Sequence, residues 1–393
     1  MTTHALSQPP VLTSRARGRA SRAGILRFVN DRFLWLPLGA LVAVVWANLD
    51  PDGYYPFAHR LQFPVNEIGM ALFVALIAHE ALDALGPGGV LRHWRHWATA
   101  LVAAAGGVVG SAFVFLAFVT WKGELVLAQA WPVAAAVDIA AGYYVLRLIY
   151  RRGHAFPFLL VSGLAANAVA LVTLATWPAF GPDHVTGAVL VLAAVGVAAA
   201  LRAAGVRRSW LVLIVAGGLS WWGFHVAGVH PALALIPVVP LLPHTRHLLE
   251  PFAERTPVAV DRQQASWIAA VQVVLFFFGL ANAGAMLRGY DTGTGAVLLG
   301  ALIGRPAGMV GAAALGRLAG LRLPASMAWR DLVVTALATS SGFTFALFTA
   351  ATLLPVGGVL TQIRVGALAT AAGALVTYGA ARWLRVGRFA HAH

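Results

Sequence analysis

Long apolar runs, separated by short polar segments, repeat along most of the chain. Most of them hold the ~20 apolar residues that a helix needs to cross a bilayer. The pattern predicts about twelve transmembrane helices, at residues 33–49, 65–86, 97–120, 129–149, 156–177, 185–202, 209–226, 229–243, 266–288, 294–316, 331–353 and 363–385. The eighth run, VHPALALIPVVPLLP, is short and broken by prolines, so a re-entrant segment is the alternative there.

The composition agrees with this pattern. Of the 393 residues, 60% are hydrophobic and 11% are charged, whereas a water-soluble domain carries roughly 25% charged residues. The predicted fold class is therefore an all-α polytopic membrane protein surrounded by membrane lipid. The net charge of +14 does not indicate nucleic-acid binding, because no basic helix face or interleaved aromatic platform accompanies it. Without cysteine, the chain cannot form disulfides or thiolate-ligated metal sites.

The basic residues are unevenly distributed over the connections between the apolar runs. Most arginines fall on one side, and the opposite side carries Arg60, Lys122, Arg288 and Arg364. By the positive-inside rule, both termini are predicted to be cytoplasmic, with the chain in the inner (plasma) membrane of the cell. The chain then divides into a basic cytoplasmic tail (1–32), a transmembrane domain (33–385) with a cytoplasmic linker (244–265), and a cytoplasmic C-terminal tail (386–393).

Two ionisable residues are predicted to lie deep in the membrane. Asp138, in WPVAAAVDIAAGYY, is the one acidic residue far from a helix end, and Arg305, in LLGALIGRPAGMVG, is the one such basic residue. A charge at mid-bilayer is energetically expensive and therefore indicates a functional site. The alternatives are that Asp138 only pairs with a neighbouring helix, and that the long side chain of Arg305 reaches the interface.

The same regions contain residues that interrupt helices. The fourth run has Pro132 before Asp138 and Gly142 after it. The eleventh run, ALATSSGFTFALFTA, is interrupted by three small residues, Ser340, Ser341 and Gly342. Interrupted helices that face each other bring helix termini to the midplane, where a carboxylate and a cation offset their dipoles. Asp138 and Arg305 have the charges for these two tasks, although small residues also serve ordinary packing in membranes.

Several stretches, taken together, resemble the NhaA-type sodium/proton antiporter family. No single motif is specific, but their order and spacing agree over roughly residues 33–385. The matching stretches are WAN at Trp46–Asn48, VNEIGMALFVALIAHE at Val65–Glu80, WPVAAAVDIA at Trp131–Ala140, GVHPAL at Gly228–Leu233, LANAG at Leu280–Gly284, IGRPAGM at Ile303–Met309 and SGFTFALF at Ser341–Phe348.

The resemblance implies a fold and a set of site residues. It implies two inverted-topology repeats, with broken fourth and eleventh helices that cross at the midplane. Asp138 corresponds to the family's carboxylate on the fourth helix, Arg305 falls where the family has a lysine, and Glu80 falls where it has a glutamate near the cytoplasmic funnel. The implied cargo is a small monovalent cation, Na⁺ or Li⁺, and the proton; a homodimer is one assembly that the resemblance allows.

The chain departs from the family at its central chemistry. The fifth helix of the family usually carries two adjacent aspartates, and those positions are Ala166 and Asn167 here; Val137 replaces a threonine. An amide oxygen can ligate sodium but cannot take up a proton near neutral pH. Arginine at position 305 also stays charged where a lysine can lose its proton. We therefore expect Asp138 to be the single titrating carboxylate and Asn167 to be a neutral sodium ligand, with altered coupling.

Three hypotheses for the function follow. The leading one is exchange of a monovalent cation for a proton. A second keeps the fold but carries an anionic or neutral cargo, because Arg305 is permanently positive and carboxylates are few. A third is a non-transporting membrane scaffold or sensor. An enzyme is not expected, and no cofactor is, because the sequence has no nucleotide-binding loop, no Cys–His pair and no HExxH motif.

Overall fold

The computed structural model describes residues 34–85, 94–150, 155–176, 183–206, 208–242, 262–286, 290–324 and 327–390. All regular secondary structure in these residues is helical. The predicted tail 1–32 and most of the predicted linker 244–265 lie outside the described residues. The predicted C-terminal tail begins with Val386, which is buried, and with a short 3₁₀ turn at Gly387–Phe389.

The helices follow the apolar runs closely. Their bounds are α2 (Trp35–Leu49), α3 (Pro51–Gln62), α4 (Met70–Leu85), α5 (Trp94–Lys122), α6 (Trp131–Ala134), α7 (Ile139–Ile149), α8 (Ala155–Thr176), α9 (His184–Ala203), α10 (Ser209–Val226), α11 (Arg262–Asn282), α12 (Thr292–Leu299), α13 (Arg305–Leu318), α14 (Trp329–Ala338), α15 (Phe343–Leu353), α16 (Gly358–Ala369) and α17 (Gly373–Trp383). Single π-helical turns, Phe63–Gly69 and Gly300–Gly304, join α3 to α4 and α12 to α13.

The length and hydropathy of these helices fit a multi-pass membrane protein. In the described part of the chain, seven helices are long and apolar enough to cross a membrane, or up to nine if each bent helix pair is one span. The α2 helix and residues Ala269–Asn282 of α11 are shorter apolar helices. The eighth run forms no helix of spanning length between residues 229 and 242, only the 3₁₀ turns Pro231–Leu233 and Val239–Leu241. Twelve crossings therefore stay a prediction.

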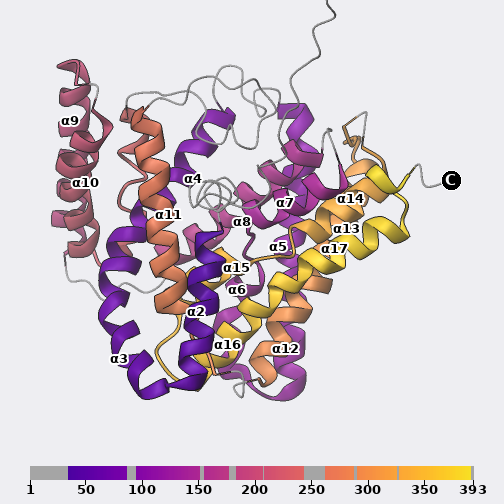
Figure 1. Cartoon of the computed structure of the whole chain (residues 1–393). Coiled ribbons are helices and arrows are strands. Elements are labelled where there is room, and N and C mark those ends of the chain that lie inside the picture. The colour runs from indigo at the N-terminus through magenta and orange to yellow at the C-terminus, as the bar shows by residue number, and fades with distance from the viewer. Residues whose placement is uncertain are drawn as a thin grey trace, which may run out of the picture.

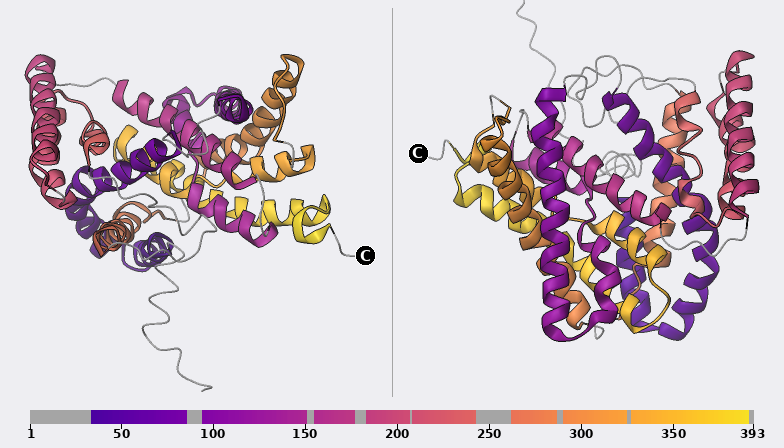
Figure 2. Two further views of the ribbon diagram at one scale, coloured as in Figure 1. Left: turned by 90° about the horizontal axis from the view of Figure 1, so that it is seen from above. Right: turned by 180° about the vertical axis from the view of Figure 1, so that it is seen from behind.

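The helices are arranged around a centre formed by α6 and α15 (Figure 1). The antiparallel pair α9 and α10 stands at one side of the molecule, and α13, α14 and α17 lie at the opposite side (Figures 1 and 2). Of the 18-residue apolar segment of α9, only 17% is buried inside the protein. The outer face of this pair is thus open to lipid or to another chain.

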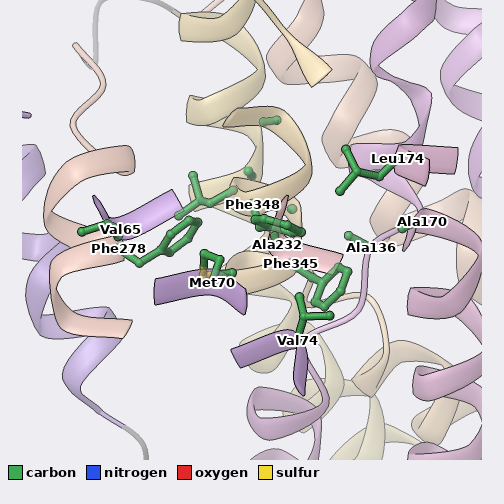
Figure 3. Close-up of a cluster of buried hydrophobic side chains, with 14 of the residues drawn as sticks. Val65, Met70, Val74, Ala136, Ala170, Leu174, Ala232, Phe278, Phe345 and Phe348 are labelled. Carbon is green, nitrogen blue, oxygen red and sulfur yellow. The ribbon is translucent and has the colours of Figure 1, made fainter. Parts of the chain in front are cut away.

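Aromatic side chains of α15 anchor the centre to the helices around it. The Phe345 and Phe348 rings lie 5.8 Å apart, and Phe348 also lies 6.4 Å from the Phe278 ring of α11. Figure 3 shows this cluster, in which Met70 and Val74 of α4 lie beside the two α15 rings. Dispersion and close packing, rather than water exclusion, hold such contacts together within a bilayer.

Two glycine pairs bring α5 and α13 into direct backbone contact. A Cβ atom added to Gly308 of α13 would lie 2.1 Å from the Gly106 carbonyl oxygen, and one added to Gly110 would lie 2.3 Å from the Gly304 carbonyl oxygen. Only residues without a side chain allow this approach, which is a common way for membrane helices to associate. The contact fixes Arg305, between Gly304 and Gly308, close to α5.

Candidate functional site

The predicted break in the fourth helix lies directly before Asp138. α6 ends at Ala134, residues 135–138 are not helical, and α7 begins at Ile139. The two segments are bent by 53°. Pro132 stands in the first turn of α6, where a proline is tolerated because that N–H has no partner within the helix.

The predicted break in the eleventh helix lies at the small residues. α14 ends at Ala338 and α15 begins at Phe343, so that Thr339, Ser340, Ser341 and Gly342 form the gap. The segments Trp329–Ala338 and Phe343–Leu353 are bent by 47°. Hydroxyl groups satisfy backbone groups around the gap: Thr339 Oγ1 donates to the Ala336 carbonyl at 2.6 Å, and the Gly342 N–H donates to Thr370 Oγ1 at 3.3 Å.

The two breaks lie against each other. The backbone N–H of Asp138 donates to the carbonyl oxygen of Ser341 at 2.7 Å. A Cβ atom on Gly342 would lie 2.7 Å from the Ala136 carbonyl oxygen, and one on Gly142 would lie 2.8 Å from the Ala338 carbonyl oxygen. Glycines on both sides are therefore needed for this approach. The breaks in the two interrupted helices therefore meet in the structure.

The Asp138 carboxylate caps both half-helices that begin at the crossing. Its Oδ1 accepts from the Ala141 N–H at 3.0 Å, in the first turn of α7. Its Oδ2 accepts from the Thr344 N–H at 3.2 Å, in the first turn of α15, and also from the Thr344 hydroxyl. Both helix N-termini carry partial positive charge, so one buried carboxylate, 8% exposed, offsets two dipoles at once. Sequence reasoning missed Thr344; its only signal was a hydroxyl just after Gly342.

The Asn167 side chain reaches the same break from α8. Asn167 Oδ1 accepts from the Val137 N–H at 3.0 Å, and Asn167 Nδ2 donates to the Val137 carbonyl oxygen at 2.9 Å. The amide is 2% exposed. Asn167 thus contacts the residue next to Asp138, and its Oδ1 keeps a second lone pair.

Arg305 is fully buried near the other end of the crossing. Its side chain is 1% exposed, and its Nε and Nη2 atoms have no hydrogen-bond partner among the described residues. Met309, one turn further along α13, accepts a hydrogen bond at its sulfur from the hydroxyl of Thr339, the residue directly after α14. Arg305 therefore lies on the helix face that turns towards the C-terminal, negative end of α14. Within the described residues, no carboxylate lies within 4.0 Å of its guanidinium.

A second arginine is buried, which corrects the prediction from sequence. Arg364 was assigned to an outside loop, but it is the seventh residue of α16 and is 8% exposed. Its electrostatic neighbours are Tyr54 and Tyr55 of α3. The prediction failed because α16 begins at Gly358, whereas the apolar pattern started the span at residue 363, directly before Arg364.

Two further acidic residues, Glu80 and Glu67, lie on or next to α4. Glu80 belongs to α4, but its side chain lies outside the described part. Glu67 lies in the π-helical turn before α4, and its Oε1 is 3.7 Å from His230 Nε2. Among the described side chains, no group of three or more His, Cys, Asp or Glu could hold a metal ion.

These features define a polytopic helical membrane protein in which two interrupted helices cross at one buried carboxylate. The model of the family described as Na+/H+ antiporter 1 matches residues 35–381. The chain belongs to this family, which confirms the resemblance seen in the sequence.

Individual relatives cover nearly the whole chain. A protein of Geobacter metallireducens named Na(+)/H(+) antiporter NhaA is 36% identical over 368 residues, which cover 89% of this chain and 95% of the relative. The protein of the same name from Geobacter sulfurreducens is 35% identical over 365 residues, with the same coverage of 89% and 95%. Na(+)/H(+) antiporter NhaA 1 of Pelobacter propionicus is 35% identical over 381 residues, covering 92% of this chain and 98% of the relative.

Proposed function

We propose that this chain exchanges sodium, or another small monovalent cation, for a proton across the plasma membrane, with Asp138 as the residue that binds either one. The observation that carries the proposal is the Asp138 carboxylate, buried between two half-helix N-termini at the crossing of α6–α7 and α14–α15. The names of the relatives, all sodium/proton antiporters, support the choice of cargo.

The chemistry requires cation and proton to compete for one group. An ionised Asp138 offers oxygen atoms to a hard cation, and unwound backbone beside it supplies further carbonyl oxygens, as at other sites on discontinuous helices. A protonated Asp138 has lost the charge that attracts the cation. Arg305 is proposed as the fixed cation that offsets the negative helix ends. For Asn167 the sequence predicts a neutral ligand, which would use the second lone pair of Oδ1, whereas its two bonds to Val137 support the other role of holding the unwound chain.

The coupling follows from the number of carboxylates. Ala166 and Asn167 replace the aspartate pair of the family's fifth helix, so one carboxylate exchanges one cation for one proton. We propose that the exchange is electroneutral. Inverted repeats, cytoplasmic termini and a homodimer complete the proposed architecture; the exposed outer face of α9 leaves room for a second copy.

Proteoliposomes with an internal pH dye test the proposal. Sodium, lithium and potassium are added in turn to purified protein, with and without an imposed membrane potential. Cation-dependent proton flux is expected, unchanged by the potential, and lost in Asp138→Asn because the amide cannot bind a proton. The matched control is Asp183→Asn, the same change at an exposed N-cap residue of α9, where asparagine caps equally well.

Two results would contradict the proposal. Flux that persists in Asp138→Asn would remove Asp138 from the exchange. No flux with any cation, in protein shown to be folded, would favour an anionic or neutral cargo bound near Arg305, or a role without transport. Transport of a radiolabelled anion that does not depend on sodium would then separate these two.

A further inference from the structure

One feature of the crossing is not needed for binding a cation: the Asn167 amide pairs with a whole peptide unit of the unwound chain. Both polar groups of Val137 are bonded by the same side chain, through Oδ1 at 3.0 Å and Nδ2 at 2.9 Å. The orientation of the amide is settled by the partners, because the flipped amide would face donor to donor and acceptor to acceptor. The side chain therefore acts as a fixed, two-point contact.

The unwound segment has a particular need for such a contact. Backbone groups within a membrane must be satisfied inside the protein, because no water is present to replace a lost helical bond. The N–H groups of Ala135 and Ala136 still bond to carbonyl oxygens of α6, at 3.2 and 3.3 Å. Val137 is the first residue whose N–H bonds to another helix, and Asp138 follows it directly.

We infer that Asn167 is a positioning residue, which holds the Val137 peptide and thereby fixes the Asp138 carboxylate between the starts of α7 and α15. The inference deepens the proposed function, on which its transport readout rests. On the other side of the break, the Asp138 N–H is bonded to Ser341. The unwound chain is thus held from α8 and from the second break, and the carboxylate is presented at a defined place.

An aspartate at position 167 separates this role from ion ligation. A protonated carboxylic acid carries one donor and one acceptor, as the amide does, and can make both bonds to Val137. An ionised carboxylate can only accept, so it loses the bond to the Val137 carbonyl oxygen and repels it. As a cation ligand, by contrast, the ionised carboxylate is better than the amide. The two roles predict opposite effects of rising pH on Asn167→Asp.

Few titratable groups lie close enough to the contact between Asn167 and Val137 to produce a pH effect of their own. Asp138 is the one next to it, and Tyr143 of α7 packs against Phe156 of α8. The helices that pack on α8 are α5, α7, α14 and α15. In their described parts, α15 has no titratable side chain, and the charged side chains of the others lie in terminal turns, at Lys122, Arg147, Arg330 and Asp331. Arg305 belongs to α13, which packs on α5.

The experiment compares Asn167→Ala, Asn167→Asp and Ser162→Ala in the full chain. Ser162 is the matched control, because it is a buried polar residue of α8 whose hydroxyl bonds within its own helix, to the carbonyl oxygens of Phe158 and Leu159. Two readouts are taken from acidic to alkaline pH: the melting temperature in detergent, with and without sodium, and the rate and KM of sodium-dependent proton flux in proteoliposomes.

We expect Asn167→Ala to raise the sodium KM about 10-fold and to lower the melting temperature, because two buried backbone groups lose their partner. Asn167→Asp should match the wild type at acidic pH, and both its melting temperature and its flux should fall relative to the wild type as pH rises. Ser162→Ala should change neither KM nor pH profile.

Three results would overturn the inference. One is an Asn167→Asp protein whose flux increases at alkaline pH and whose melting temperature is then raised by sodium, since this identifies residue 167 as a ligand. Another is a loss in Asn167→Asp that is the same at every pH, and the third is no difference between Asn167→Ala and Ser162→Ala. If no cation drives flux in the wild type, the proposed function fails, while the melting curves still decide on the contact with Val137.

Discussion

At the scale of single residues, Asp138 connects two parts of the chain that are 206 residues apart in sequence. Its carboxylate receives donors from α7 and from α15, and the Thr344 hydroxyl is the only side chain among those donors. Hydrogen bonds to a carboxylate also fix its position and direction. Thr344 should therefore hold the Asp138 carboxylate in place between the starts of α7 and α15.

We predict that Thr344→Val weakens sodium-dependent proton flux. Valine keeps the shape and the backbone N–H but removes the hydroxyl donor, so the Asp138 carboxylate is held less firmly between the two helix starts. A hydrogen bond to a charged group contributes about 1.5–3 kcal/mol, which corresponds to roughly a 10- to 100-fold change. Flux in proteoliposomes at graded sodium concentrations measures it.

Thr349→Val is the control for this prediction. Thr349 is also a buried threonine of α15, but its hydroxyl bonds to the Phe345 carbonyl of its own helix at 2.7 Å. Its sodium-dependent flux should equal that of the wild type. Equal flux in Thr344→Val and Thr349→Val would show that the hydroxyl at 344 does not act on Asp138.

At the scale of elements, the glycine contact between α5 and α13 makes a prediction about stability. Gly308→Ala places a Cβ atom 2.1 Å from the Gly106 carbonyl oxygen, so the helices must separate or bend. Overpacking of this kind destabilises by about 1–3 kcal/mol. A lower melting temperature in detergent is expected, together with weaker transport, because Arg305 is carried on the same turn.

Gly311→Ala tests whether the contact or the loss of a glycine is responsible. Gly311 lies on the same helix, but a Cβ atom there meets nothing within 4 Å. Alanine should leave the melting temperature unchanged or raise it slightly, because glycine is the poorer helix former by about 1 kcal/mol. A fall as large as that of Gly308→Ala would place the effect in the helix itself rather than in its packing.

The two helix breaks could be predicted from the sequence, whereas the contacts between distant helices could not. Pro132, Gly142 and the Ser340–Gly342 group predicted both breaks, because helix interruption is a local property of the chain. The bonds from Thr344 to Asp138 and from Asn167 to Val137 depend on how distant helices cross, and no periodicity contains that information. The position of Arg364 was predicted wrongly for another reason. α16 begins at Gly358, and its first turns contain Gly358, Thr361 and Gln362, which the apolar pattern does not count as part of a span. Gln362 accepts a hydrogen bond from the Gly293 N–H of α12, another contact that the pattern does not contain.

At the scale of the whole molecule, the orientation in the membrane can be measured directly because the chain has no cysteine. Every single-cysteine variant then reports one position without a background signal. We predict that Lys122→Cys, at the exposed end of α5, reacts with a membrane-impermeant maleimide added outside intact cells. Ala204→Cys, exposed just after α9, should react only after the cells are opened.

The reverse labelling pattern would invert the predicted orientation. Labelling of both positions from one side would instead show that the number of crossings between residues 122 and 204 is even. In either case the orientation predicted from the basic residues by the positive-inside rule would be wrong. A membrane-permeant maleimide, which should label both variants, controls for reactivity.

The way in which Asn167 bonds to Val137 also bears on how the protein can change by mutation over generations. Only peptide atoms of Val137 take part, so its side chain is subject to packing alone, in a small apolar cluster with Val108, Ala135 and Ala166. We therefore expect position 137 to accept other small apolar residues freely. Position 167, in contrast, should accept few residues, because a side chain there needs both a donor and an acceptor at that reach, and aspartate offers both only while it is protonated.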